Sequence, residues 1–164
     1  MILRFIRGLF SETLYVQIWE NRIKITHIES RRVYDQKPWI ALDIRNSKKQ
    51  IVVAVGDEAY AIQGRHGTEA SNPFSHPRLL VKNFLKAEKV LQHGVRTVCA
   101  RKVFNPSPVI VIHPREKLEG GLTDIECRLF RELCLGAGAH AVHLHVGEEL
   151  DVHNFKVSAL SDAH

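Results

Sequence analysis

The alternation of apolar and polar positions predicts strands in the first third of the chain. Residues 13–28 form two runs rich in β-branched and aromatic side chains around the polar residues 20–22, which predicts a β-hairpin that turns there. Two further strands are predicted at 39–44 and 50–56, with a polar turn between them. The sheet is therefore expected to begin as a meander.

Helical periodicity starts in the middle of the chain. A short helix is predicted at 57–63, followed by a loop at 65–77 that contains many turn-forming residues and two prolines. Apolar residues at every third or fourth position then predict a long helix at 78–94, opened by Pro77 and ended by Gly94.

The last third of the chain has the order strand, helix, strand. Short apolar runs at 108–113 and 141–146 are typical of strands buried on both faces, and a helix is predicted between them at 123–137. A βαβ unit of this kind pairs its two strands in parallel. The pattern therefore predicts an α/β domain with a mixed sheet flanked by helices.

The length of the chain predicts a single domain. A chain of 164 residues, of which 45% are hydrophobic, is sized for a single domain with one core. We expect an amphipathic N-terminal segment at 1–11, a single lobe at 12–146 and a polar tail at 147–164 that frays.

The N-terminal segment has the pattern of a basic amphipathic helix. Its arginines fall on one side of a helical wheel and its large apolar residues on the other. One interpretation is a helix that packs on its own domain, and the other is a helix that binds an anionic membrane surface weakly and reversibly. The residues that would contact lipid are Ile2, Leu3, Arg4, Phe5, Ile6, Arg7, Leu9 and Phe10.

A net charge of +5 favours an anionic partner, which could be a lipid surface or a nucleic acid. The basic residues are dispersed and lack the interleaved aromatic side chains of a stacking platform, so no specific nucleic acid is expected. No stretch approaches the ~18 consecutive apolar residues of a transmembrane helix. The charge therefore leaves peripheral membrane contact as the more specific expectation.

The cysteines and histidines give little indication of a site. Cys99, Cys127 and Cys134 are widely spaced without a CxxC pair, which argues against a disulfide framework or a zinc knuckle and predicts a reducing, cytoplasmic setting. His143 and His145 share one face of a predicted strand and could begin a metal site. No carboxylate pair or clear third ligand completes it, so no metal is expected.

Glu126 has two interpretations. It stands three residues after Thr123 at the start of a predicted helix, which is the spacing of a capping box. The spacing alone favours this structural role over a catalytic one. The chain also lacks the common nucleotide and hydrolase motifs GxxxxGK[ST], GxGxxG and GxSxG.

Four stretches, in order, resemble a known family. They are VGDEAYAIQGR at 55–65, PVIVIHP at 108–114, LTDIECR at 122–128 and LGAGAHAVHL at 135–144. These stretches are similar to segments of the bacterial actin-like MreB/Mbl proteins, which determine rod shape. The resemblance covers about residues 1–146, which corresponds to the first half of a complete family member. It implies a ribonuclease H-like first lobe, whose relatives bind ATP and Mg²⁺.

The phosphate-binding turn departs from that family. Where the family has DLGTANT in its first hairpin, this chain has Gln17, Trp19, Glu20 and Asn21, which replace the metal-binding aspartate and the glycine and add a negative charge. The second phosphate loop and the second lobe would lie beyond the end of this sequence. Glu126 matches the family glutamate that positions the attacking water, although the loop before it is longer here. The resemblance therefore implies a degenerate site that binds no cofactor.

Three functions remain as hypotheses. The first is a non-catalytic, truncated actin-like lobe that acts as a protein-interaction or membrane-associated element related to cell shape, with full-length relatives or other cell-shape proteins as partners. It would be cytoplasmic or peripheral on the inner face of the cell membrane. The second is an actin-like ATPase that completes its site for ATP and Mg²⁺ with another chain. The third, a nucleic-acid-binding module, predicts steeply salt-dependent binding. The oligomeric state is left open.

Overall fold

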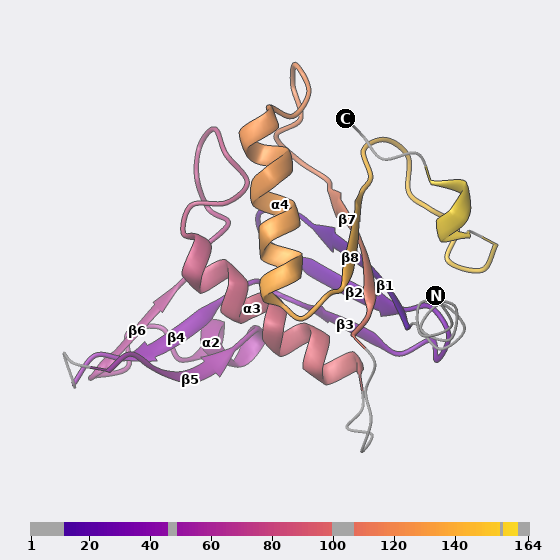
Figure 1. The fold of residues 1–164 in the computed structure, drawn as a ribbon. Helices are drawn as coiled ribbons and strands as arrows, with labels where there is room; N and C mark the ends of the chain where they lie inside the picture. Colours follow the sequence, from indigo (N-terminus) through magenta and orange to yellow (C-terminus); the bar gives the residue numbers. More distant parts are fainter. Residues whose placement is uncertain (1–11, 46–48, 100–106, 155, 161–164) are drawn as a thin grey trace.

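A mixed five-stranded sheet forms the centre of the molecule (Figure 1). The computed structural model describes residues 12–45, 49–99, 107–154 and 156–160, so the predicted N-terminal helix and its lipid-contacting residues lie outside the described part. The strand order is β3-β2-β1-β7-β8. The strands are β1 (Thr13–Ile18), β2 (Ile23–His27), β3 (Val33–Gln36), β7 (Val109–Pro114) and β8 (Ala141–Leu144).

The predicted hairpin and the predicted parallel pair are both confirmed. β1 and β2 are antiparallel and turn where the sequence predicts, and β3 continues the antiparallel part. β1 pairs in parallel with β7, and β7 in parallel with β8. The prediction that 141–146 is buried on both faces is wrong, because β8 is the edge strand and only Leu144 is buried along it.

A second, three-stranded sheet lies beside the first. The strands predicted at 39–44 and 50–56 belong to this second sheet, so the predicted meander does not run through a single sheet. The second sheet consists of β4 (Ile40–Asp43), β5 (Ile51–Val55) and β6 (Thr68–Ser71) in the order β5-β4-β6, with the short helix α2 (Asp57–Ala61) packed on it. Residues 68–71 belong to the segment 65–77, whose turn-forming residues and two prolines predict a loop, and this part of the prediction is wrong. They become a strand through antiparallel pairing with β4, which tertiary context supplies and local propensity does not.

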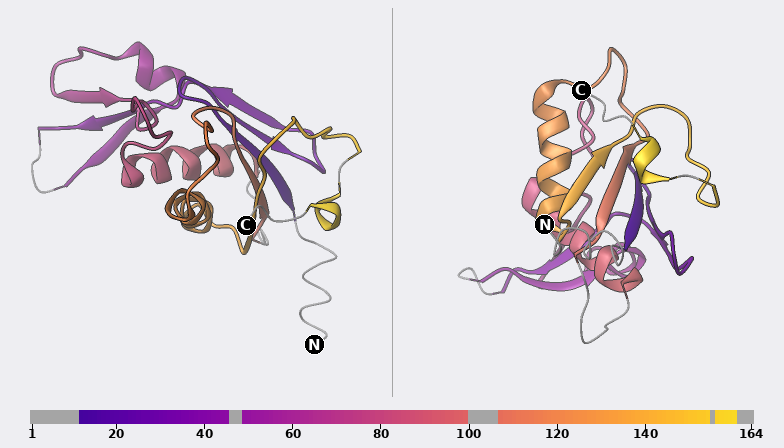
Figure 2. Two further views of the ribbon diagram at one scale, coloured as in Figure 1. Left: turned by 90° about the horizontal axis from the view of Figure 1, so that it is seen from above. Right: turned by 45° about the vertical axis from the view of Figure 1, so that its right-hand side comes forward.

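Two helices cover one face of the five-stranded sheet (Figure 2). α3 (Phe84–Val98) packs on β2 and β3, and α4 (Asp124–Gly136) packs on β7, β8 and α3. The main core lies between these helices and the strand residues that point toward them, such as Leu14 and Val16. No helix among the described residues has both the length and the apolar character needed to cross a bilayer.

The boundaries predicted for the long helix are wrong at both ends. α3 begins after Asn83, whose side chain accepts a hydrogen bond from the Lys86 backbone N–H at 3.0 Å. Leu80 and Val81 are buried in the segment before the helix, so they extend the apolar pattern without being helical. Gly94 does not end the helix. It lies inside α3, where a Cβ atom would come within 2.5 Å of Ile25 Cδ1.

The close contact at Gly94 gives a stability prediction. We expect Gly94→Ala to lower the free energy of unfolding by about 1–2 kcal/mol, because overpacking against β2 exceeds the gain in helix propensity. Urea denaturation measures the change. Arg96→Ala, at an exposed position of the same helix, is the matched control and should change stability by less than about 0.5 kcal/mol. A Gly94→Ala protein as stable as this control would contradict the proposed close packing.

The C-terminal segment covers the other face of the sheet. Side chains alternate along β1, so Tyr15 and Gln17 point away from the helices, yet they are 0% and 1% exposed. The Leu150 N–H donates to Tyr15 Oη at 3.2 Å, and the Gln17 amide donates to Glu149 Oε1 at 3.0 Å. Residues 149 and 150 of the predicted polar tail therefore hydrogen-bond to side chains of β1.

Candidate functional site

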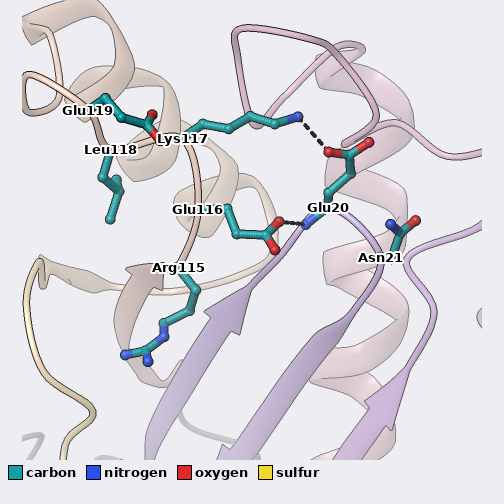
Figure 3. Close-up of a pocket in the computed structure, with 7 residues that line it drawn as sticks. All are labelled: Glu20, Asn21, Arg115, Glu116, Lys117, Leu118 and Glu119. Atoms are coloured by element: carbon teal, nitrogen blue, oxygen red, sulfur yellow. Dashed lines mark hydrogen bonds and ion pairs between the residues drawn. The ribbon is translucent and has the colours of Figure 1, made fainter.

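The candidate site lies at one edge of the five-stranded sheet, where two loops meet. β1 and β7 are parallel neighbours with Ile18 opposite Pro114, so both strands end at the same edge. The β1–β2 turn at 19–22 and the loop that follows β7 consequently face each other (Figure 3). Between them is an open depression of about 700 Å³, lined by Glu20, Asn21, Arg115, Glu116, Lys117, Leu118 and Glu119.

The loop after β7 binds the turn directly. The backbone N–H of Glu20 donates to Glu116 Oε2 at 2.6 Å, and Lys117 Nζ forms an ion pair with Glu20 Oε2 at 2.9 Å (Figure 3). Lys117 also donates to the His76 carbonyl oxygen, and its backbone has a φ of 59°, which is uncommon for a lysine. The backbone amide and the carboxylate of Glu20 are therefore both bound by other residues of the same chain.

The electrostatics of the depression disfavour a phosphate. The hydrogen bond from Lys117 lowers the pKa of Glu20, so this carboxylate carries its charge at neutral pH. The lining contains three carboxylates and two cationic side chains. A phosphate group would have to displace Glu116 from the Glu20 amide and then lie beside the Glu20 charge.

The four residues expected to form a degenerate phosphate turn are only partly brought together. Glu20 and Asn21 line the depression, whereas the buried Gln17 side chain bonds to Glu149. The Trp19 ring lies beside two guanidinium groups, with Arg22 Cζ 5.0 Å and Arg115 Cζ 5.8 Å from its centroid. Trp19 therefore packs with two cationic side chains and is not among the residues that line the depression.

Glu126 caps its own helix, as its spacing predicts. The Glu126 N–H donates to Thr123 Oγ1 at 3.3 Å, and Glu126 Oε2 accepts from the Thr123 N–H at 2.8 Å. Thr123 Oγ1 also donates to Glu126 Oε2, at 2.7 Å. Glu126 is not among the residues that line the depression. Its carboxylate is thus engaged at the start of α4.

The capping box gives a second stability prediction. We expect Glu126→Ala to lower the free energy of unfolding by about 1 kcal/mol, because it removes the acceptor for the Thr123 N–H. Glu126→Gln keeps that acceptor and should retain most of the stability. Chemical denaturation of both variants provides the comparison. Equal losses in the two would mean that the negative charge, rather than the hydrogen bond, stabilises the helix start.

A histidine that sequence reasoning missed lies under the C-terminal segment. His113 is 0% exposed, its Nδ1 accepts from Tyr15 Oη at 2.6 Å, and its Nε2 lies 3.1 Å from the Gly147 carbonyl oxygen. Burial above all, and then nearby His145 and Arg115, lower its pKa to about 4. The signal available in the sequence was a polar residue at the end of an apolar strand.

The histidines considered as metal ligands in the sequence do not form a cluster. Of His143 and His145, the second has its Nε2 2.8 Å from the Glu148 carbonyl oxygen. The His145 ring also contacts His113, with 4.5 Å between ring centroids. Among the described residues, the group whose ligand atoms could share a metal ion includes none of these histidines and lies elsewhere in the fold.

Sequence relatives of the chain include cell shape-determining proteins. No family model matches the chain. MreB of Haemophilus influenzae is 29% identical over 147 residues, which are 88% of this chain and 40% of that protein. MreB of Escherichia coli K12 is 27% identical over 147 residues, with 87% and 40% covered. The chain thus spans about 40% of the length of these relatives.

A shorter relative matches over most of its own length. The uncharacterized protein YjaA of Escherichia coli K12 is 32% identical over 129 residues, which are 76% of this chain and 75% of YjaA. The sequence similarity between YjaA and this chain therefore extends over most of both proteins.

Similar solved structures are actin-like proteins. MreB5 of Spiroplasma citri bound to AMPPNP has a TM-score of 0.64 at 14% identity, with 83% of this chain and 38% of that chain covered. A non-polymerising MamK mutant bound to AMPPNP has a TM-score of 0.63 at 14% identity, with 83% and 41% covered. A MamK double helical filament has a TM-score of 0.57 at 14% identity, with 82% and 40% covered. These likenesses confirm the predicted actin-like fold of the lobe.

Proposed function

The chain is an MreB-like chain with an actin-like fold and belongs to the same family as YjaA, and from this premise we propose that it is a non-catalytic interaction element. In this proposal the lobe contacts filament-forming actin-like chains and neither binds nor hydrolyses ATP. Its setting is the cell-shape machinery, to which the MreB relatives are assigned by name.

The contact between the Glu20 amide and the Glu116 carboxylate, 2.6 Å long, is the observation that carries the proposal. Phosphate sites of this kind present free backbone N–H groups to the anion. Here a carboxylate of the same chain accepts from the turn, and Lys117 neutralises Glu20 instead of a phosphate. Glu116 and Lys117 both belong to the loop at 115–121, which is longer here than its counterpart in the MreB/Mbl family.

Calorimetric titration with ATP or AMPPNP in the presence of Mg²⁺ tests the non-catalytic part. We expect no binding up to millimolar nucleotide. The same titration of Glu116→Ala asks whether freeing the Glu20 amide is enough to admit phosphate, and Glu119→Ala is the matched control at the same rim. Micromolar affinity of the unaltered chain would overturn the proposal and support an ATPase that completes its site with another chain.

Cosedimentation with a full-length MreB relative tests the interaction. We expect the lobe to pellet with the filaments or to change the amount that assembles, because a segment that corresponds to about 40% of an MreB chain can reproduce only part of that chain's contacts. The filament is described for MamK, among the structural neighbours. An unchanged pellet and a lobe that stays in the supernatant at all ratios would contradict the proposal.

The amphipathic pattern of residues 1–11 supports a second contact, with an anionic membrane surface. Flotation with vesicles that contain phosphatidylglycerol should recover the intact chain and should recover much less of a chain that lacks residues 1–10. Vesicles of phosphatidylcholine alone are the control for charge. Equal recovery of the two chains would remove membrane contact from the proposed function and would leave the filament contact unaffected.

A further inference from the structure

Three metal-binding side chains meet at the end of β1 opposite the depression. Glu12 precedes β1, His27 ends β2, and Cys99 is the C-cap of α3. The antiparallel pairing of β1 with β2 brings the first two together, since Leu14 lies opposite His27. One ligand atom from each of the three side chains lies within 4.8 Å of the other two.

We propose that Glu12, His27 and Cys99 form a site for a divalent transition metal, with zinc as the ion that fits best. A thiolate, an imidazole and a carboxylate are the three ligand types that zinc uses in proteins. The combined charge of one thiolate and one carboxylate balances a divalent ion. Three protein ligands leave one tetrahedral position for water.

The spacing of the ligand atoms fits a tetrahedral ion. His27 Nε2 and Glu12 Oε2 are 3.4 Å apart. Two ligands about 2.0 Å from a zinc ion at the tetrahedral angle are separated by about 3.3 Å. The His27 and Glu12 side chains are 6% and 13% exposed, so these two ligands are largely shielded from solvent. His27 and Glu12 therefore already stand at the separation of two zinc ligands, and Cys99 lies within reach of both.

Glu29 supports the orientation of His27 that a metal requires. Its Oε2 lies 3.4 Å from His27 Nδ1, and both of its oxygens accept from the Thr13 N–H. The Ser30 N–H also lies 3.2 Å from Nδ1 and needs a lone pair there. A metal at Nε2 would place the ring proton on Nδ1, where Glu29 can accept it, and the Ser30 N–H would then lose its acceptor. This is the carboxylate–histidine–metal arrangement that orients ligands in many zinc sites.

The surroundings of Cys99 favour a cation. The Glu12 carboxylate lies beside the Cys99 thiol and makes its surroundings negative. Cys99 also stands at the C-terminal end of α3, where the helix dipole is negative. A bound ion would connect this helix end to β1 and β2. Sequence analysis does not reveal this site, because its three residues are far apart along the chain.

Cobalt spectroscopy of the full-length chain tests the proposal. Titration of the reduced protein with Co²⁺ should give a near-ultraviolet thiolate-to-cobalt band with one ion bound, and excess Zn²⁺ should remove it. We expect Cys99→Ser and Glu12→Gln to lower Co²⁺ affinity at least tenfold and Cys99→Ser to abolish the band. His66→Ala, at an exposed turn, should bind as the unaltered chain does.

Glu29→Gln refines the assignment. It keeps an acceptor for the Thr13 N–H but weakens the support of His27, so it should lower Zn²⁺ affinity by about 10–100-fold while the cobalt band remains. Circular dichroism checks that each variant folds. If Cys99→Ser does not fold, Zn²⁺-dependent protection of Cys99 against alkylation, read by peptide mass spectrometry, replaces it.

Any of three results would overturn the metal site. The first is the absence of a thiolate-to-cobalt band in the unaltered chain, the second is a band that persists in Cys99→Ser, and the third is Cys99 alkylation that Zn²⁺ does not slow. Each would reduce the cluster to hydrogen bonds between its side chains. These measurements do not depend on nucleotide binding or filament association. The metal site can therefore be refuted or supported independently of the proposed function.

Discussion

Acidification from neutral pH to about pH 4 is expected to lower the free energy of unfolding by about 2–3 kcal/mol through His113 alone. Burial, with His145 and Arg115 nearby, lowers its pKa from 6.5 to about 4 in the folded chain. Between these values the unfolded chain binds more protons than the folded chain. The stabilisation is therefore complete above pH 6.5 and is lost as the pH falls toward 4.

The hydrogen bonds of His113 explain why its charged form is unfavourable. Nδ1 accepts the Tyr15 hydroxyl proton at 2.6 Å, and the Leu150 N–H donates to the same Tyr15 oxygen. Protonation of Nδ1 would remove this acceptor and place a charge in a site with no exposed surface. The neutral ring is consequently the form that the fold selects.

Denaturant unfolding at several pH values measures this contribution. The carboxylates that lose stabilising partners in acid also contribute to the slope, so the difference between the unaltered chain and His113→Gln isolates the histidine. Gln keeps an acceptor and a donor but does not titrate, and its curve should be flatter between pH 6.5 and 4. His66→Gln, at an exposed turn, should follow the unaltered chain. Equal slopes for His113→Gln and the unaltered chain would refute this role.

The parts of the fold that sequence predicts well are those with strong local signals. The hairpin at 19–22, the βαβ unit and the capping box at Thr123 each depend on residues close together in the chain, and the structure confirms all three. Where pairing partners are distant, prediction fails. β6 has a polar sequence and becomes a strand only because β4 lies beside it.

The candidate site shows the same division. The replacement of the phosphate turn was visible in the sequence, because Gln17 and Trp19 stand where the MreB/Mbl family has an aspartate and a glycine, and Glu20 adds a negative charge. The contact from Glu116 to the Glu20 amide joins residues 96 positions apart and was not visible. The same holds for Glu12, His27 and Cys99, which only the folded chain brings together. Long-range contacts, rather than residue types, therefore limited the sequence reading.

Removal of residues 147–164 is expected to lower the free energy of unfolding by about 2–4 kcal/mol. The segment covers the face of the sheet opposite the helices, where Tyr15 and His113 are 0% exposed. Its loss would expose the Tyr15 ring and break the bonds that join Leu150 to Tyr15 and Glu149 to Gln17. A fraying tail, as its polar composition predicts, would instead be dispensable.

Urea denaturation of three chains separates these possibilities. Leu150→Pro removes the N–H that donates to Tyr15 and also restricts the local backbone, so it should cost at least about 1 kcal/mol. His153→Ala, at an exposed position, should stay within about 0.5 kcal/mol of the unaltered chain. The shortened chain should be the least stable. If it does not fold, Leu150→Pro still tests the contact. A shortened chain that unfolds at the same urea concentration as the full chain would contradict this prediction. It would show that the C-terminal segment does not stabilise this face of the sheet, and that water can hydrogen-bond to the polar groups of β1 and β7 in its place.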